Sequence, residues 1–196
     1  MAGWRHHLAD RSTATAVIGG RTVSVEEIRG VVTRLPWVAE QELVSIAPAD
    51  RAYIAAEMSA FLVFWLSDLN CRVLNRPTPG SLNGPSWRRE QWMFAGRRVG
   101  MRVAPERRQL SLKSAVMPPK QLPASMVTVV GRRCLGQVDS VLLDQSRQLA
   151  EAANAELLGI QFSDANPDAT FLNATLYPEI DSIEITDAIL EHFGRA

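Results

Sequence analysis

Two short apolar runs near the end of the chain most constrain its fold, because they closely follow an amphipathic helical pattern. Residues 138–154 repeat apolar side chains at the helical period, and residues 156–162 and 170–174 read as two short strands. A final helix is expected over residues 182–193. Because strands and helices are also mixed earlier in the chain, this order is typical of an α/β or mixed α+β architecture.

Size and hydropathy predict a compact globular protein. The chain has 196 residues, 46% of them hydrophobic, which is enough for one large domain or two lobes with a substantial core. The longest apolar stretch, residues 54–66, is interrupted by Glu57 and is shorter than the roughly 20 residues that a membrane-spanning helix needs. We therefore expect a buried helix there and no membrane anchor. The chain starts without an apolar leader, and Cys71 and Cys134 lie far apart, so reduced thiols in a cytoplasmic protein are expected.

The charges are sorted along the chain although the net charge is zero. Residues 72–133 hold thirteen lysines and arginines against two acids, whereas residues 139–196 hold eleven acids against two arginines. This asymmetry predicts two faces with different partners, or two halves that neutralise each other on folding. Nucleic-acid binding through the 72–133 segment is an alternative. The aromatic residues Trp87, Trp92 and Phe94 recur there at helical spacing, which suits a core face better than a stacking platform and disfavours nucleic acid as a partner.

The N-terminal part predicts a hairpin and then a helix. Two β-prone runs flank a Gly-Gly pair at positions 19 and 20, which favours a two-residue turn because glycine accepts a positive φ at both turn positions. Ser24 followed three residues later by Glu27 is a capping-box pattern. It predicts a helix that begins there and stops before Pro36.

A proline-rich and glycine-rich loop forms the best candidate for a binding site. The loop follows an expected strand at residues 71–75 and leads into an expected helix at residues 87–99. Backbone N–H groups at the start of a helix can face an anion, and neighbouring arginines would add positive charge. The candidate residues for binding an anion or ligand are Asn75, Arg76, Trp87, Arg88, Arg89 and Gln91. In the alternative interpretation, the prolines and Trp87 pack a long connection while the arginines pair with the acidic half.

Four prolines and weak periodicity mark residues 105–124 as a long connection between two lobes. The predicted organisation is therefore an N-terminal lobe over residues 1–104, this connection, and a C-terminal lobe over residues 125–196. Two strands joined at Gly131 are expected to open the C-terminal lobe.

The segment over residues 157–178, LLGIQFSDANPDATFLNATLYP, resembles the last two strands of ATP-grasp ligases. In that superfamily a strand of pattern G-h-D-h, where h is apolar, precedes a strand of pattern h-E-h-N-x-x-P. The two acids and the amide hold the magnesium ions that bridge the ATP phosphates. The resemblance places Gln161, Asn173 and Thr175 at these ligand positions, with Pro178 matching. All three ligand positions are altered, so the resemblance implies a degenerate site without metal.

Earlier landmarks resemble the pre-ATP-grasp domain found ahead of RimK-like ligases and peptide maturases. They are the hairpin, the long apolar helix, the strand that leads into VLNRP and the helix that opens with SWRREQW. Arg88 takes the lysine position of a K-x-x-Q-L pattern in that domain, and Gln91 is retained. Residues 100–125 are too short for the nucleotide-binding lobe that ATP-grasp folds carry between their halves. The resemblance implies a shortened, degenerate member: a pre-ATP-grasp-like N-terminal lobe and a remnant of the ATP-grasp C-terminal lobe.

These features predict a non-catalytic binding or scaffolding protein, an accessory partner of a peptide-modifying or ligase system. Neutral side chains at the ligand positions cannot offset the charge of a metal and a triphosphate, so ATP and Mg²⁺ are expected not to bind productively, and no catalytic residue is assigned. A peptide or protein partner is expected. A homodimer is a further expectation, because a shortened chain would leave apolar strand faces uncovered. The alternative is a reduced ATP-dependent ligase or nucleotide-binding enzyme that uses Arg76, Arg88 and Gln91.

Overall fold

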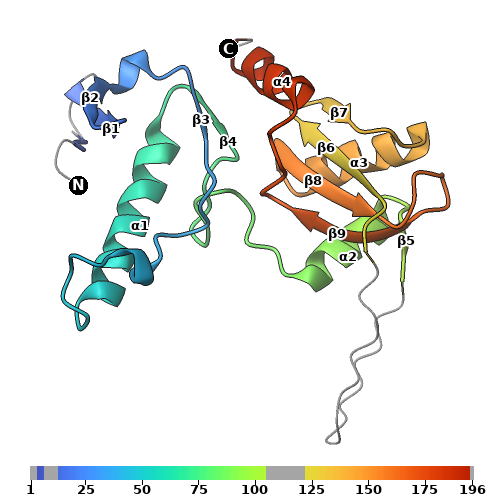
Figure 1. The fold of residues 1–196 in the computed structure, drawn as a ribbon, viewed down its shortest axis with the longest axis horizontal. Helices are drawn as coiled ribbons and strands as arrows, with labels where there is room; N and C mark the ends of the chain where they lie inside the picture. Colours follow the sequence, from blue (N-terminus) through green and yellow to red (C-terminus); the bar gives the residue numbers. More distant parts are fainter. Residues whose placement is uncertain (1–3, 7–12, 105–121, 195–196) are drawn as a thin grey trace, which may run out of the picture. The chain divides into compact units, whose positions relative to one another are not determined.

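The computed structural model describes residues 4–6, 13–104 and 122–194, which belong to two compact units (Figure 1). Unit 1 comprises Met1–Ser86 and Ile189–Ala196, and unit 2 comprises Trp87–Ala188. The expected lobe connection over residues 105–124 falls mostly outside the described residues. The mixture of strands and helices in both units confirms the α/β class predicted from the sequence.

Unit 1 opens with the predicted hairpin. Its turn residues Gly19 and Gly20 have φ values of 56° and 77°, which confirms the turn expected from the glycine pair. The elements of the unit in chain order are β1 (Thr15–Ile18), β2 (Arg21–Ser24), the 3-10 turn η2 (Val25–Glu27), β3 (Gly30–Val32), the 3-10 turn η3 (Glu40–Glu42), α1 (Arg51–Asp68) and β4 (Arg72–Leu74).

The prediction of a helix that begins at Ser24 is wrong, because the chain makes only the single turn η2 before it enters β3. The capping box itself forms, since the Glu27 carboxylate accepts a hydrogen bond from the Ser24 N–H at 3.0 Å. The chain then pairs in parallel with β4, and Val31 lies opposite Val73. A long-range pairing of β-branched residues therefore overrides the local helix-start signal.

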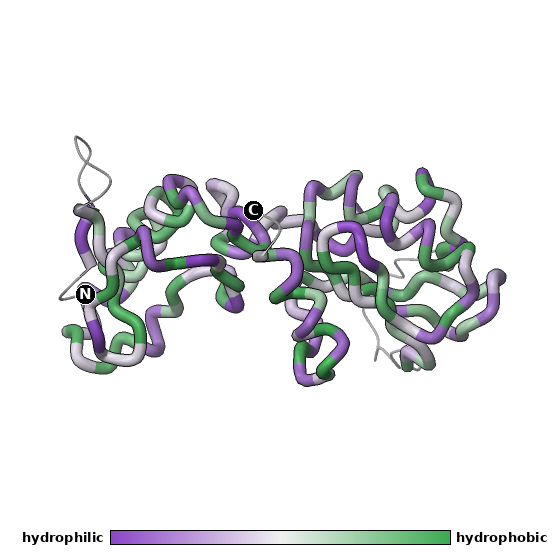
Figure 2. The backbone as a smooth tube through the Cα atoms, turned by 90° about the horizontal axis from the view of Figure 1, so that it is seen from above, coloured by the Kyte–Doolittle hydropathy of each residue, from purple (hydrophilic) through white to green (hydrophobic). Residues whose placement is uncertain are grey.

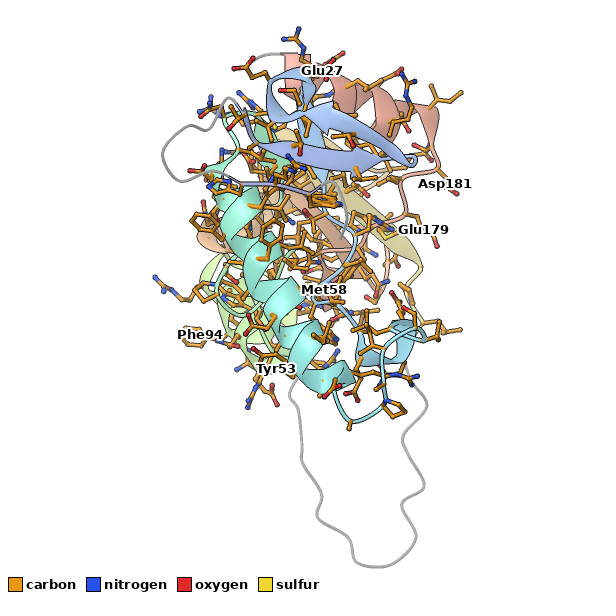
Figure 3. The ribbon with its side chains drawn as sticks, turned by 90° about the vertical axis from the view of Figure 1, so that its left-hand side faces the viewer. Glu27, Tyr53, Met58, Phe94, Glu179 and Asp181 are labelled. Carbon is orange, nitrogen blue, oxygen red and sulfur yellow. The ribbon has the colours of Figure 1, made fainter. Side chains whose placement is uncertain are left out.

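Helix α1 confirms the long helix expected from the apolar run, but its large buried side chains lie in its C-terminal part, and Ala55 is the buried residue of its N-terminal part. Trp65 and Leu66 are buried in the C-terminal part, together with Leu69, the residue that directly follows the helix. Tyr53, which the periodicity assigned to the core, is 66% exposed and projects from the helix (Figure 3). The reason is that the N-terminal part of α1 packs against the short turn η3, which cannot cover it.

Within residues 4–6, 13–104 and 122–194, no helix combines the length and apolar character that crossing a membrane requires. Figure 2 shows hydrophobic and hydrophilic residues interleaved along the chain.

Unit 2 is built on a five-stranded sheet in the order β5-β9-β8-β6-β7. All neighbouring strands are antiparallel except β5 and β9, which run parallel. The elements are α2 (Arg89–Arg98), β5 (Arg102–Val103), β6 (Ser125–Val130), β7 (Arg133–Leu135), α3 (Ser140–Ala152), β8 (Leu157–Phe162), β9 (Thr170–Thr175) and α4 (Ile183–Gly194). The strands and helices expected after residue 87 are therefore confirmed. In α4, residues from Ile189 onward belong to unit 1.

One face of this sheet forms the core of unit 2. Ile160 and Phe162 of β8 are fully buried in a cluster that includes Trp92 of α2 and Leu142 and Leu149 of α3. Helices α2 and α3 therefore cover this face (Figure 1). Because side chains alternate along a strand, the residues between these positions point to the opposite face.

The division between the units differs from the predicted boundary, because residues 87–104 join the C-terminal strands. Strand β5 pairs with β9, with Arg102 opposite Thr170. The Arg89 guanidinium at the start of α2 donates to the Leu172 carbonyl of β9 at 3.0 Å. Gly96 lets α2 approach β9, since a Cβ there would lie 3.0 Å from the Phe171 ring. The predicted N-terminal lobe thus loses its last helix and strand to unit 2.

The close approach of Gly136 to β6 yields a stability prediction. A Cβ at Gly136 would lie 2.5 Å from the Met126 carbonyl oxygen, and its φ is +156°. Gly136→Ala should therefore lower the free energy of unfolding of unit 2 by about 2–4 kcal/mol. The measurement is urea denaturation followed by circular dichroism. Gly100→Ala is the matched control, because φ is +85° there but only the Gln145 amide is near, so it should cost about 1 kcal/mol. Equal losses in the two variants would contradict the steric argument.

Candidate functional site

The three altered ligand positions lie together on the sheet face opposite the core. Gln161 of β8 is directly opposite Asn173 of β9 in the antiparallel register, and Thr175 lies opposite Gly159. Gln161, Asn173 and Thr175 are each half-buried, whereas their strand neighbours Ile160 and Ala174 are buried. Strand alternation therefore places the three polar side chains on one face.

Glycine and proline of the same pattern shape this part of the sheet. A Cβ at Gly159 would lie 3.1 Å from both the Pro178 Cβ and the Thr175 Cγ2. Gly159 thus leaves room for Pro178, which is buried, to pack onto the strand. The chain turns there because the Thr175 hydroxyl accepts a hydrogen bond from the Tyr177 N–H at 3.1 Å. These residues position the polar face whatever its chemistry is.

The chemistry of this face is neutral. An amide offers donors and an acceptor, and a hydroxyl offers both, but neither carries charge. Magnesium prefers carboxylate and water oxygens in near-octahedral geometry. In the part of the chain that the structure describes, no group of three His, Cys, Asp or Glu side chains is placed to hold a metal ion. Gln161, Asn173 and Thr175 therefore present uncharged hydrogen-bond donors and acceptors on this face.

The six residues predicted as an anion or ligand site fall into two units. Asn75 and Arg76 belong to unit 1. Asn75 is 1% exposed, and its Nδ2 donates to the Asn83 carbonyl at 3.2 Å, so its amide holds the loop together. Arg76 is exposed but donates to the carbonyls of Ser67 and Cys71 at 3.4 and 3.3 Å, beside the end of α1.

Trp87, Arg88, Arg89 and Gln91 belong to unit 2 and mostly serve the start of α2. The Arg88 N–H, expected to face an anion, donates to the Gln91 Oε1 at 2.8 Å. Gln91 therefore caps the helix instead of presenting its carbonyl to a ligand. The Arg89 guanidinium bonds to β9, as described for the fold. Trp87 packs against Trp92 with ring centroids 4.7 Å apart.

A groove beside α2 brings two of the predicted residues together with ones that the sequence did not single out. Its volume is about 690 Å³. Its lining includes Trp87, Glu90, Gln91, Phe94, Ala95 and Arg98. Phe94 was expected on the core face but is 65% exposed, and Figure 3 shows its ring projecting outward. Helical spacing could not reveal this, because Trp92 and Ala95 already fill the buried face of α2.

The described arginines of the basic segment belong to both units. Arg72 lies 3.1 Å from the His192 Nε2 within unit 1, and Arg102 pairs with Asp168 at 2.8 Å within unit 2. Arg97 and Arg98 in the last turn of α2 are exposed. Of these two, Arg98 lines the α2 groove and adds a positive charge there, and Glu90 adds a negative one. The described arginines are thus divided between the units and partly engaged in bonds within each unit.

The two cysteines are free and half-buried. Burial raises the pKa of the Cys71 thiol, against a smaller opposing effect from Arg76. Burial likewise raises the pKa of the Cys134 thiol, with Arg147 opposing it. A thiol nucleophile needs a lowered pKa, so neither cysteine has the surroundings of a catalytic thiolate.

The architecture is similar to that of solved structures. Macrocyclase MdnC from Microcystis aeruginosa MRC, bound with precursor peptide MdnA, matches with a TM-score of 0.61 and 12% identity over 91% of this chain and 82% of MdnC. A Chryseobacterium gregarium RiPP-associated ATP-grasp ligase, in complex with ADP and a leader and core peptide, matches with a TM-score of 0.62 and 10% identity. This match covers 93% of this chain and 84% of that ligase. No protein-family profile and no curated protein matches the sequence. At these identities the likeness shows the fold alone, and the ATP-grasp-like fold expected from residues 157–178 is confirmed.

The raised thiol pKa values predict slow alkylation. A raised pKa leaves less thiolate at each pH, so iodoacetamide should modify both cysteines more slowly than it modifies glutathione at about pH 8. The rate should still rise as the pH passes 9.0, the ordinary thiol pKa. Mass spectrometry of the Cys71→Ser and Cys134→Ser variants separates the two sites, and urea-unfolded protein is the control. A rate that levels off below about pH 8 would contradict this prediction.

Proposed function

We propose that this chain is a non-catalytic ATP-grasp-like protein that binds a peptide as part of a peptide-modifying system. The observation that carries the proposal is the face formed by Gln161, Asn173 and Thr175, three uncharged side chains at the positions where the ATP-grasp resemblance expects metal ligands. Phosphoryl transfer depends on metal ions that neutralise the charge developing on the phosphates. A face without carboxylates loses that support, while the fold that carries it remains.

The fold neighbours support a peptide as the partner. One of them is bound with a precursor peptide, and the other is in complex with a leader and core peptide. In this chain the α2 groove offers an exposed aromatic ring, Phe94, next to the half-buried Trp87. Large rigid aromatic side chains contribute much of the energy of peptide recognition. Arg97 and Arg98 at the end of α2 favour acidic side chains beside the apolar ones.

The absence of charge on the polar face predicts how the protein responds to Mg-ATP. Isothermal titration of the intact protein should give no magnesium-dependent heat of binding. The variant Gln161→Asp/Asn173→Glu/Thr175→Asn restores the ligand pattern, and about 10 mM MgCl₂ should raise its melting temperature by about 3 °C. Without magnesium it should melt below the natural protein, because two carboxylates directly opposite each other repel.

Matched controls separate metal binding from a general salt effect. Gln161→Asp and Asn173→Glu alone each add one carboxylate and should respond less to magnesium than the triple variant. Sodium chloride at equal ionic strength should not reproduce the effect. Micromolar, magnesium-dependent binding of ATP by the natural protein would refute the proposal. So would release of phosphate from ATP in the presence of amino acids or peptides.

The groove predicts the chemistry of the peptide. Selection from a random 12-residue phage-displayed library on the intact protein should enrich peptides with aromatic or aliphatic residues flanked by Asp or Glu. Phe94→Asp should weaken a selected peptide by about tenfold to a hundredfold, since it removes an apolar anchor and adds repulsion. Fluorescence anisotropy with the labelled peptide measures the change.

Tyr53→Asp is the control for this prediction, because Tyr53 is as exposed as Phe94 but belongs to unit 1. Its affinity for the selected peptide should equal that of the natural protein. The groove is excluded as the peptide site if both variants bind the peptide as the natural protein does.

A further inference from the structure

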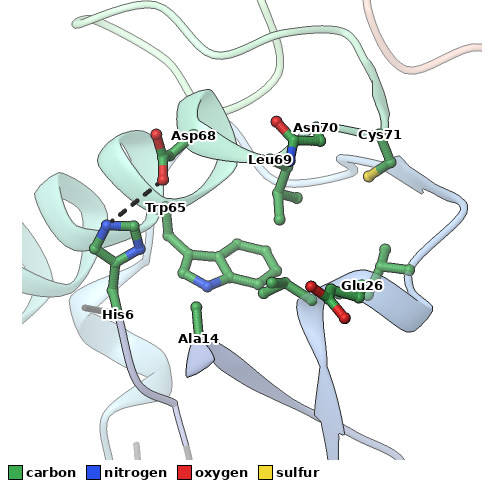
Figure 4. A pocket seen from close by; sticks show the side chains of 10 residues that line it. His6, Ala14, Glu26, Trp65, Asp68, Leu69, Asn70 and Cys71 are labelled. Carbon is green, nitrogen blue, oxygen red and sulfur yellow. Dashed lines mark ion pairs between the residues drawn. The ribbon is translucent and has the colours of Figure 1, made fainter. Parts of the chain in front are cut away.

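A small pocket in unit 1 is lined by residues that belong neither to the polar face of β8 and β9 nor to the α2 groove. Its volume is about 130 Å³. Charged and polar groups from three segments of the chain meet there: His6, Glu26, Trp65, Asp68 and Cys71. Figure 4 shows the Trp65 indole in the middle, with Glu26 on one side and the pair of His6 and Asp68 on the other.

Trp65 presents a buried donor without an acceptor. The side chain is 3% exposed, and its Nε1–H has no hydrogen-bond partner within the described residues. An edge-to-face contact with Trp4, at a centroid distance of 4.9 Å, holds the ring in place. Figure 4 shows the nitrogen on the side of Ala14, another residue of the pocket lining. Because an unsatisfied buried donor is costly, this N–H indicates a place for an acceptor atom.

The charges of the pocket divide into a paired and an open part. His6 Nε2 lies 3.6 Å from Asp68 Oδ2, and both side chains are largely buried. Glu26, by contrast, is exposed, and its carboxylate makes no ion pair or hydrogen bond among the residues that the structure describes. The Cys71 thiol is neutral, because burial raises its pKa. Glu26 is therefore the group that can take a new cation.

A metal ion does not fit this arrangement. Within residues 4–6, 13–104 and 122–194, no three His, Cys, Asp or Glu side chains are placed to hold one. A bare cation would also leave the Trp65 N–H unsatisfied, because it offers no acceptor. The complementary ligand carries a positively charged N–H donor for Glu26 and an oxygen acceptor for Trp65.

We propose that this pocket binds an α-amino carbonyl group, that is, an ammonium group beside a carbonyl oxygen. The ammonium donates to Glu26, the carbonyl oxygen accepts from Trp65 Nε1, and a small side chain packs on Ala14 and Leu69. Such a group occurs at the free N-terminus of a peptide and in amino-acid amides. The volume suits it, since about 130 Å³ is that of roughly four water molecules. This inference is independent of the peptide role proposed for α2, because the pocket belongs to unit 1.

The experiment is a titration of the intact ¹⁵N-labelled protein by nuclear magnetic resonance. The Trp65 indole N–H signal is assigned with Trp65→Phe and then followed during additions of L-alaninamide, which should move it saturably. Lactamide replaces the ammonium by a hydroxyl, and isopropylamine lacks the carbonyl. Each should bind at least about tenfold more weakly than alaninamide. Lactamide keeps a donor for Glu26 but loses the positive charge, and isopropylamine loses the acceptor for Trp65.

Two further ligands distinguish the sources of the group. Ala-Gly-Gly amide has a free N-terminus, and its N-acetylated form does not. Binding of the free tripeptide but not of the acetylated one assigns the pocket to a peptide N-terminus. If alaninamide binds and neither tripeptide does, the pocket is assigned to a small amino-acid amide.

Variants test the roles of the two side chains. Glu26→Gln should lower the affinity for alaninamide by about tenfold or more, because it removes the negative charge that attracts the ammonium. Glu57→Gln makes the same charge change on the exposed side of α1, away from the pocket, and should have no effect. Trp65→Phe should weaken binding measured by calorimetry. The proposal is overturned by the absence of a saturable shift with alaninamide and the tripeptide, by equal binding of lactamide, or by an unchanged affinity in Glu26→Gln.

Discussion

The antiparallel pairing of β8 with β9 is the interaction on which unit 2 depends, because its register decides which side chains enter the core. Gln161 opposite Asn173 puts Ile160 and Phe162 on the other face, where α2 and α3 cover them. A slip by one residue would exchange the two sets and bury two amides in place of fully apolar side chains. The apolar residues thus fix the position of the polar face. Gln161, Asn173 and Thr175 are therefore held in a row by the packing of the apolar residues on the opposite face of the sheet.

The elements whose signals are local in sequence could be predicted. The Gly19–Gly20 turn, the long helix α1 and the βαββ order at the end of the chain follow from glycine chemistry and hydrophobic period alone. The prediction of a helix after Ser24 failed because Gly30–Val32 have a strand partner 42 positions further along the chain, in β4, with Gly30 opposite Arg72. The prediction that Tyr53 lies in the core failed for a related reason, since its side chain is exposed. Periodicity identifies an apolar face but not whether another element covers it.

The candidate sites show the same limit. The row of Gln161, Asn173 and Thr175 was predictable because two neighbouring strands supply it. The six residues between 75 and 91 are close in sequence, but two of them belong to unit 1 and four to unit 2. Gln91 is the clearest case: its side chain carbonyl binds the Arg88 N–H at the start of α2, a partner only three residues away. The pocket around Trp65 draws on positions from 6 to 71 and has no motif that a sequence pattern could reveal.

The resemblance at the end of the chain mixes residues that make the fold with residues that make chemistry, and the structure separates them. Gly159 and Pro178 fit each other sterically, because any Cβ on the glycine would press on the proline ring. They are needed to build this strand end whether or not a metal binds. Gln161 and Asn173 are half-buried, and the acids of the ligand pattern, Asp at 161 and Glu at 173, differ from them in charge and by one methylene in length. A match at Gly159 and Pro178 is therefore evidence for the fold. Only the residues at positions 161, 173 and 175 are evidence about activity. Three substitutions in the polar row, Gln161→Asp, Asn173→Glu and Thr175→Asn, would restore the ligand pattern without changing Gly159 or Pro178. Evidence for the fold and evidence about activity can therefore point in opposite directions within one pair of strands.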